Sequence, residues 1–238
     1  MTDPAAPGPG FPGFPLGLGL LTSAGAQSKA QFQAGKSTWD GAITAPAQAL
    51  VVAVGEALQA RVSGGINAVP KTNGSLSPIT RDLRFARDAG RPYKDHLLLN
   101  FWEGSPKRHA PTLRVRIAEE HTGFAAGAAF DADGLARWRA ALCSDPAREL
   151  IELLSRAGAS HELQTTEPEL KKPPSGFAAI SEPAADLLRH KTFQARFVEP
   201  TPPLVTGPGF ASWVVDRITE LGELHRWLVR HTQPEDRR

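Results

Sequence analysis

One segment of the chain, residues 79–94, gathers most of the side chains that are able to do chemistry. This basic block holds guanidinium, ammonium, carboxylate and phenol groups on Arg81, Asp82, Arg84, Arg87, Asp88, Arg91, Tyr93 and Lys94. Residues 79–116 carry nine basic and four acidic side chains, a net +5 in a chain whose formal net charge is only +2. Because a guanidinium binds carboxylate or phosphate through two parallel hydrogen bonds, the block predicts a site for an anion.

Within the block, Arg81 has an unusual predicted position. Apolar residues alternate with polar ones from Ile79 to Phe85, which predicts a strand, and a period of two puts Arg81 on the apolar face. An unpaired charge on such a face is costly. Two interpretations remain open. Either this face opens into a cleft where Arg81 binds a planar anion, or Arg81 or Arg84 pairs with Asp88 and fastens a loop to the sheet.

A second group of basic residues lies further along the chain. Lys171 and Lys172 precede two prolines, which stiffen the loop and present the ammonium groups at lower entropic cost. Lys191 follows the next predicted helix and is the third member. If this group meets the basic block in space, the two form one electropositive cleft. The candidate anion-binding residues are therefore Arg81, Arg84, Arg87, Tyr93, Lys94, Lys171, Lys172 and Lys191.

The same residues admit an enzyme acting on an anionic substrate. The candidates to hold the substrate are Arg81, Arg84 and Lys94, and those to move a proton are Asp82, Asp88 and Tyr93. The sequence contains no evident nucleophile–base pair and no close metal-ligand spacing such as His-x-x-x-His. We therefore expect no metal and no cofactor, and we favour an anion-binding domain over an enzyme.

Composition excludes several classes of protein. A single cysteine, Cys143, rules out an intrachain disulfide and a multi-cysteine zinc site. No apolar run approaches the roughly 20 residues that span a bilayer, and the early prolines and the absence of early basic residues argue against a secretory signal. The small net charge and the lack of aromatic residues interleaved with the basic block argue against nucleic acid. We expect a cytoplasmic protein with a small anionic ligand and no membrane; the oligomeric state is not predicted.

Periodicity and turn residues predict the elements that must position these side chains. Helices are expected over 16–24, 44–62, 131–142, 146–158, 181–190 and 210–230, and strands over 79–85, 96–102, 113–117, 123–130, 161–164 and 193–198. The strands cluster in the middle of the chain, which favours an α+β fold. We expect a largely antiparallel sheet of four to five strands, covered by helices on one side, with a long C-terminal helix.

The domain boundaries follow from composition. Residues 1–15 are rich in glycine and proline and are expected to form a disordered tail, residues 16–232 a single α+β domain, and residues 233–238 a charged disordered tail. In the predicted last helix, Trp213 and Trp227 share one apolar face. That face supports a third interpretation, a structural or interaction module that docks through its C-terminal helix.

Four stretches resemble, in the same order, the microbial family known as domain of unknown function 2461. They are Arg81–Asp88 with Pro92–Lys94, Phe124–Gly127, Trp138–Leu142 with its inward Arg139, and Leu170–Phe177 followed by Lys191–Phe193. The resemblance covers residues 40–200 and implies an α+β fold but no established activity. Two features depart from the family: one more residue than usual separates Asp88 from Pro92, and the Asn-Asn and Trp-Phe pairs expected near Ala24–Phe32 are missing.

Overall fold

The computed structural model of the protein describes residues 10–81 and 92–234. Within them, six strands form one antiparallel sheet in the order β1-β2-β3-β4-β6-β5. The strands are β1 (Ile66–Asn67), β2 (Leu97–Glu103), β3 (Thr112–Ile117), β4 (His121–Ala129), β5 (Gln164–Thr165) and β6 (Thr192–Pro200). The predicted α+β fold with an antiparallel sheet is confirmed. The sheet exceeds the expected four to five strands because two-residue strands, β1 and β5, pair at its edges.

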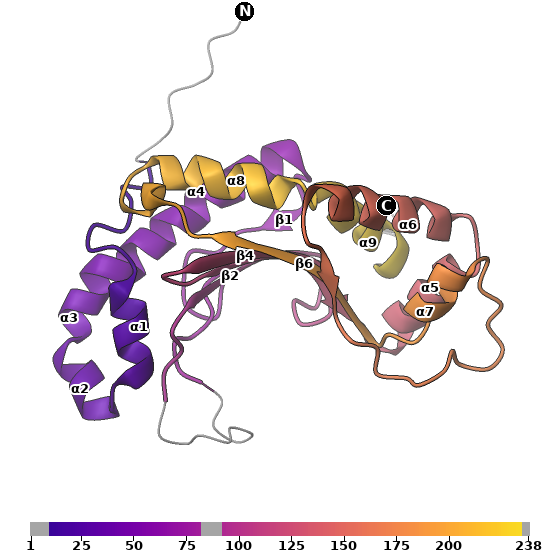
Figure 1. The fold of residues 1–238 in the computed structure, drawn as a ribbon, viewed down its shortest axis with the longest axis horizontal. Coiled ribbons are helices and arrows are strands. Elements are labelled where there is room, and N and C mark those ends of the chain that lie inside the picture. The colour runs from indigo at the N-terminus through magenta and orange to yellow at the C-terminus, as the bar shows by residue number, and fades with distance from the viewer. Residues whose placement is uncertain (1–9, 82–91, 235–238) are drawn as a thin grey trace, which may run out of the picture.

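Helices precede and follow the strands of the sheet. They are α1 (Gly19–Ala26), α2 (Lys29–Ala34), α3 (Lys36–Trp39), a π-helical segment η1 (Asp40–Thr44), α4 (Ala45–Arg61), α5 (Ala132–Leu142), α6 (Pro146–Ser160), α7 (Glu182–Leu187), a 3-10 turn η3 (Pro203–Thr206), α8 (Gly209–Thr219) and α9 (Gly222–Thr232). Figure 1 shows α4, α8 and α9 over one face of the sheet, with α1–α3 at one end of the molecule and α5 and α7 at the other.

Strand alternation decides which face of the sheet those helices cover. On β3, Leu113, Val115 and Ile117 are fully buried, whereas Arg114 is half-buried and Arg116 is exposed. Successive strand residues point to opposite faces, so the apolar set packs under α8 and α9 and the arginines lie on the opposite face. We call this opposite side the open face of the sheet. The strands expected over 113–117 and 123–130 pair in antiparallel register as the hairpin of β3 and β4.

The predicted long C-terminal helix is two helices, α8 and α9. The amides of Glu220 and Leu221 donate to carbonyls three residues back, at 3.3 and 3.2 Å, which tightens the turn and ends α8. Gly222 then lies against Val62, where an added Cβ would be 3.0 Å from a methyl group. The apolar periodicity of the sequence does not reveal the break between α8 and α9, because the apolar residues of both helices continue on the same face. Trp227 on that face is fully buried in the protein's own core, so the face is not available for docking.

The expectation of a disordered N-terminal tail is wrong for residues 10–15. Phe11 and Phe14 are buried, and both rings lie 6.2 Å from the ring of Phe210. The backbone N–H of Phe14 also donates to the carbonyl of Val205 at 2.9 Å. Glycine and proline exclude a helix or strand here, but they do not prevent aromatic side chains from packing. Residues 1–9 and 235–238 lie outside the described part of the chain.

One helical stretch is long and apolar enough, by length and composition, to cross a membrane. It runs from Lys36 to Arg61 and includes α4. Half of its most apolar window is buried inside the protein, where Leu50, Val54 and Leu58 are fully enclosed. A stretch buried to this extent is typical of a core helix.

Candidate functional site

The described ends of the basic block form a short antiparallel ladder ahead of β2. The N–H of Arg81 donates to the carbonyl of Pro92, and the N–H of Lys94 donates to that of Ile79, each at 2.8 Å. The Arg81 side chain is exposed, which corrects the expectation that it lies among apolar neighbours. The predicted face does not extend this far, since Ile79 is itself only partly buried. Asp82, Arg84, Arg87 and Asp88 lie outside the described residues and stay predictions.

Tyr93 and Lys94 are both held by neighbouring segments. The Tyr93 ring is buried and stacks on Phe32, with centroids 4.2 Å apart. Lys94 Nζ donates to the carbonyl of Pro78 at 2.6 Å, and burial lowers the pKa of the Lys94 ammonium. The tyrosine therefore packs against the N-terminal helices, and the lysine fastens the ladder to the loop before it.

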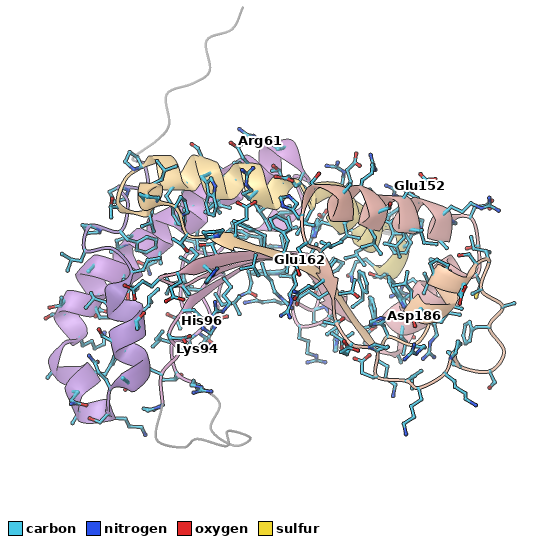
Figure 2. All side chains as sticks on the ribbon, in the orientation of Figure 1. Arg61, Lys94, His96, Glu152, Glu162 and Asp186 are labelled. Carbon is cyan, nitrogen blue, oxygen red and sulfur yellow. The ribbon has the colours of Figure 1, made fainter. Side chains whose placement is uncertain are left out.

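The described members of the two predicted basic groups do not meet. Lys94 precedes β2, at the end of the sheet where Leu97 pairs with Ile117. Lys191 precedes β6, at the opposite end, where Thr192 pairs with Ala129. Figure 2 shows Lys94 near α1–α3, while the chain leading into α7, which carries the exposed Lys171 and Lys172, lies on the far side of the molecule (Figure 1). The condition for one shared electropositive cleft, that the two groups meet, is therefore not met by the described residues.

A different set of cations comes together on the open face. The antiparallel register aligns one residue of each of five strands in a row: Asn100, Arg114, Ala125, Arg196 and Gln164. The Arg114 side chain crosses β4 and its Nη1 donates to Oε1 of Gln194 on β6 at 2.8 Å. Only small residues of β4 lie beneath it, which leaves room for the crossing. Burial in this position lowers the pKa of the Arg114 guanidinium.

Beside Arg114 the open face is hollowed into a pocket of about 400 Å³. It lies between β2, β3 and the loops that hold residues 73–78 and 107–108. Its lining residues are Asn73, Gly74, Leu76, Ser77, Pro78, Asn100, Lys107, Arg108, Thr112 and Arg114. Three of these side chains are cationic and none is a carboxylate. We call it the cationic pocket.

The loop beside β2 is fixed in place by hydrogen bonds to the strand. The N–H of Asn100 donates to the carbonyl of Ser75 at 2.8 Å, and the Asn100 amide donates to Oγ of Ser77 at 3.1 Å. Lys94 holds the same loop through Pro78, which lines the pocket. One residue of the predicted block thus supports the pocket wall.

The three pocket cations have neutral hydrogen-bond partners. Lys107 Nζ donates to the carbonyls of Asn73, at 2.9 Å, and Gly74, and lies 4.5 Å from the centre of the Trp102 ring. Arg108 Nε donates to Nε2 of His109 at 2.8 Å. Within the described part of the chain, no carboxylate lies within 4.0 Å of the Lys107, Arg108 or Arg114 cation. These partners orient the charges without neutralising them.

Several other arginines of the protein are neutralised by acids. Arg61 pairs with Asp216 at 3.0 Å, and Arg156 pairs with Glu223 at 2.7 Å. On the open face itself, Arg116 lies 3.5 Å from Asp95. The cationic pocket is thus distinguished by the absence of acids among its lining residues. Its positive field attracts anions, and partial burial weakens the screening by solvent.

Lys107, Arg108 and Arg114 were not among the sequence-predicted site residues. A signal for Arg114 is present, because the alternation from Leu113 to Ile117 places Arg114 and Arg116 on the face opposite the core. The sequence contains no comparable signal for Lys107 and Arg108, whose loop is brought to the strands only by folding. Among residues 10–81 and 92–234, no group of three His, Cys, Asp or Glu side chains is placed to hold a metal ion.

Fold and site together define an α+β protein with a cationic pocket on the open face of an antiparallel sheet. The chain belongs to the family described as "Conserved hypothetical protein (DUF2461)", whose model matches residues 22–227. The family resemblance expected from the sequence is therefore confirmed, and the match includes every residue that lines the pocket. No curated protein and no solved structure matches the chain.

Proposed function

We propose that the protein binds a small ligand carrying a phosphate or carboxylate group in the cationic pocket. One observation carries the proposal: Lys107, Arg108 and Arg114 line a pocket with no carboxylate among its described lining residues, and each donates to a carbonyl, an imidazole nitrogen or a glutamine amide. A pocket of about 400 Å³ is of the size that accepts small molecules. The anion-binding function expected from the sequence is thus retained, with a different set of residues.

The cations have distinct roles in this proposal. Arg114 extends from the floor, and its bond to Gln194 limits its rotamers, so little entropy is lost when an anion binds. Lys107 and Arg108 approach from the loop wall. Asn100 and Ser77 supply an amide and a hydroxyl beside them. Binding an anion also offsets the cost of keeping the Arg114 charge partly away from water.

The composition of the pocket favours binding over turnover. None of its lining residues is an acid, a histidine or a cysteine that would act as a general base or a nucleophile. We further propose that the protein acts in the cytoplasm, where its lone Cys143 stays a free thiol.

Inorganic phosphate and citrate are suitable probes, and the test measures thermal stability and calorimetric affinity. We expect millimolar phosphate or citrate to raise the melting temperature, because a ligand that binds only the folded state stabilises it. Arg108→Gln changes an exposed side chain and should lower the affinity about tenfold, since a charge-assisted hydrogen bond contributes about 1.5–3 kcal/mol. Arg114→Gln should lower it at least as much.

Arg148→Gln is the matched control, because Arg148 is an exposed arginine of α6 that lies 3.8 Å from Asp145. It removes the same formal charge and should leave the affinity unchanged. The proposal is overturned if neither probe stabilises the wild-type protein, or if Arg148→Gln and Arg108→Gln weaken binding equally.

A further inference from the structure

We infer that the ligand is a linear anion with at least two phosphoryl groups, which runs from the cationic pocket across β4 to Arg196. This inference rests on the proposed function and specifies the class of ligand. It starts from the register of the strands, which aligns Arg114 of β3 with Ala125 of β4, and Ala125 with Arg196 of β6.

Arg196 repeats the arrangement found at Arg114. Its Nη2 donates to Oε1 of Gln164 at 3.2 Å, so a neutral glutamine amide again orients the guanidinium. No carboxylate among the described residues lies within 4.0 Å of it. The side chain is exposed on the open face. Two guanidinium groups without a carboxylate partner among the described residues therefore lie on one row of one face.

The two charges are also close along β6. Arg114 reaches Gln194, and Gln194 and Arg196 are two positions apart on the same side of that strand. Two residues of a strand span about 7 Å. A ligand held by Arg114 beside Gln194 therefore lies two strand positions from the backbone of Arg196, and it must extend along the open face to reach the Arg196 guanidinium, which bonds Gln164 on β5.

The strand between the two arginines carries only small side chains on the open face. They belong to Gly123, Ala125 and Gly127 of β4, so β4 itself contributes nothing larger than a methyl group beneath the Arg114 side chain. The other arginine of this face, Arg116, is paired with Asp95. The uncompensated charge therefore continues from Arg114 toward Arg196 and not toward Arg116.

The open face favours a phosphoryl chain over single-stranded nucleic acid. Proteins that bind single strands stack bases on aromatic side chains. The aromatic residue beside the pocket, Trp102, has one face of its ring covered by Lys107. Among the described strand residues of this face, the large apolar side chain that is exposed belongs to Val198, which offers no stacking surface.

The test compares calorimetric affinities for phosphate, pyrophosphate, tripolyphosphate and an oligothymidylate at one ionic strength. We expect tripolyphosphate to bind about tenfold or more tightly than phosphate, because it adds charge-assisted bonds to Arg196. Arg196→Gln should abolish the tighter binding of tripolyphosphate relative to phosphate and leave the affinity for phosphate unchanged. Arg116→Gln, on the same face, should leave that tighter binding in place.

The possible failures are distinguishable. If no anion binds, the proposed function itself fails. If phosphate binds but the longer anions bind no more tightly, only this inference is overturned. It is also overturned if Arg196→Gln and Arg116→Gln reduce the tighter binding of tripolyphosphate equally, which would indicate general surface charge. Tighter binding of the oligothymidylate than of tripolyphosphate would overturn it in favour of nucleic acid.

Discussion

The guanidinium of Arg114 crosses one entire strand to reach the amide of Gln194, with Nη1 and Oε1 2.8 Å apart. A carboxylate at position 194 would hold the arginine equally well but would neutralise it. The glutamine holds the side chain in place and leaves its charge available on the open face. This contrasts with Arg217, which is held by Glu199 at 3.0 Å.

Replacing Gln194 by glutamate tests the importance of that neutral partner. We expect Gln194→Glu to lower the affinity for phosphate about tenfold, because the new carboxylate competes with the ligand for Arg114, while the new ion pair keeps the protein folded. Titration calorimetry measures the first effect and denaturant unfolding the second. Gln194→Ala, which removes the partner without adding a charge, should weaken binding less. Equal affinities of Gln194→Glu and wild type would contradict the prediction.

The two glycines on the open face of β4 should differ in how well they tolerate an added side chain. At Gly127 an added Cβ would overlap the carbonyl oxygen of Phe193 on β6. At Gly123 the nearest atom to such a Cβ is a Val198 methyl carbon at 3.6 Å, an ordinary contact. We expect Gly127→Ala to lower the free energy of unfolding by about 1–3 kcal/mol, as overpacking does. Gly123→Ala is the matched control and should change it by less than about 0.5 kcal/mol. If Gly127→Ala and Gly123→Ala changed the free energy of unfolding equally in denaturant, β4 and β6 would have to move apart readily at Gly127.

A partly buried carboxylate bonded to a buried imidazole predicts sensitivity to acid. Glu103 lies 3.1 Å from Nε2 of the fully buried His225 and accepts a hydrogen bond from Ser63 Oγ at 2.6 Å. The hydrogen bond with His225, followed by the one from Ser63, lowers the pKa of Glu103 below its ordinary value of 4.5, although burial opposes the shift. Because the folded-state pKa is the lower one, this contribution to stability is present above pH 4.5 and is lost as the pH falls through the folded-state value.

Glu103→Gln should therefore lower the free energy of unfolding by about 1–3 kcal/mol at neutral pH and flatten its decline in acid. Urea unfolding between neutral pH and pH of about 3 measures both effects. Glu152→Gln, a change on α6 (labelled in Figure 2), serves as control. If the free energy of unfolding of Glu103→Gln fell with decreasing pH as steeply as that of the wild type, other carboxylates would govern the loss of stability in acid.

The packing of the N-terminal segment predicts a large contribution to stability. Phe14 is fully buried against Phe11 and Phe210, with ring centroids 5.4 and 6.2 Å away. Phe14→Ala should lower the free energy of unfolding by about 3–5 kcal/mol, as other buried phenylalanines do. Leu16→Ala removes a neighbouring side chain that is 62% exposed and should have little effect. If Phe14→Ala lowered the free energy of unfolding only slightly, the N-terminal segment would not be part of the core.

Local patterns in the sequence determined the class of fold and most of its elements. The expected strands over 113–117 and 123–130 match β3 and β4. The expected helix over 131–142 matches α5, which Asp131 caps by accepting a hydrogen bond from the N–H of Gly134 at 2.8 Å. Such features depend on residues a few positions apart, where periodicity and capping apply directly.

Tertiary structure decided which cations form the site. Arg114 and Gln194 are 80 positions apart in the chain and meet because β4 lies between them with only small side chains. Arg81 was predicted to lie on an apolar face of a strand and is exposed, whereas Arg114 was not predicted as a site residue and lines the pocket. Periodicity assigns a side chain to a face, but its partner depends on the order of the strands. Whether a charge is neutralised is therefore a property of the folded sheet and cannot be obtained from local sequence.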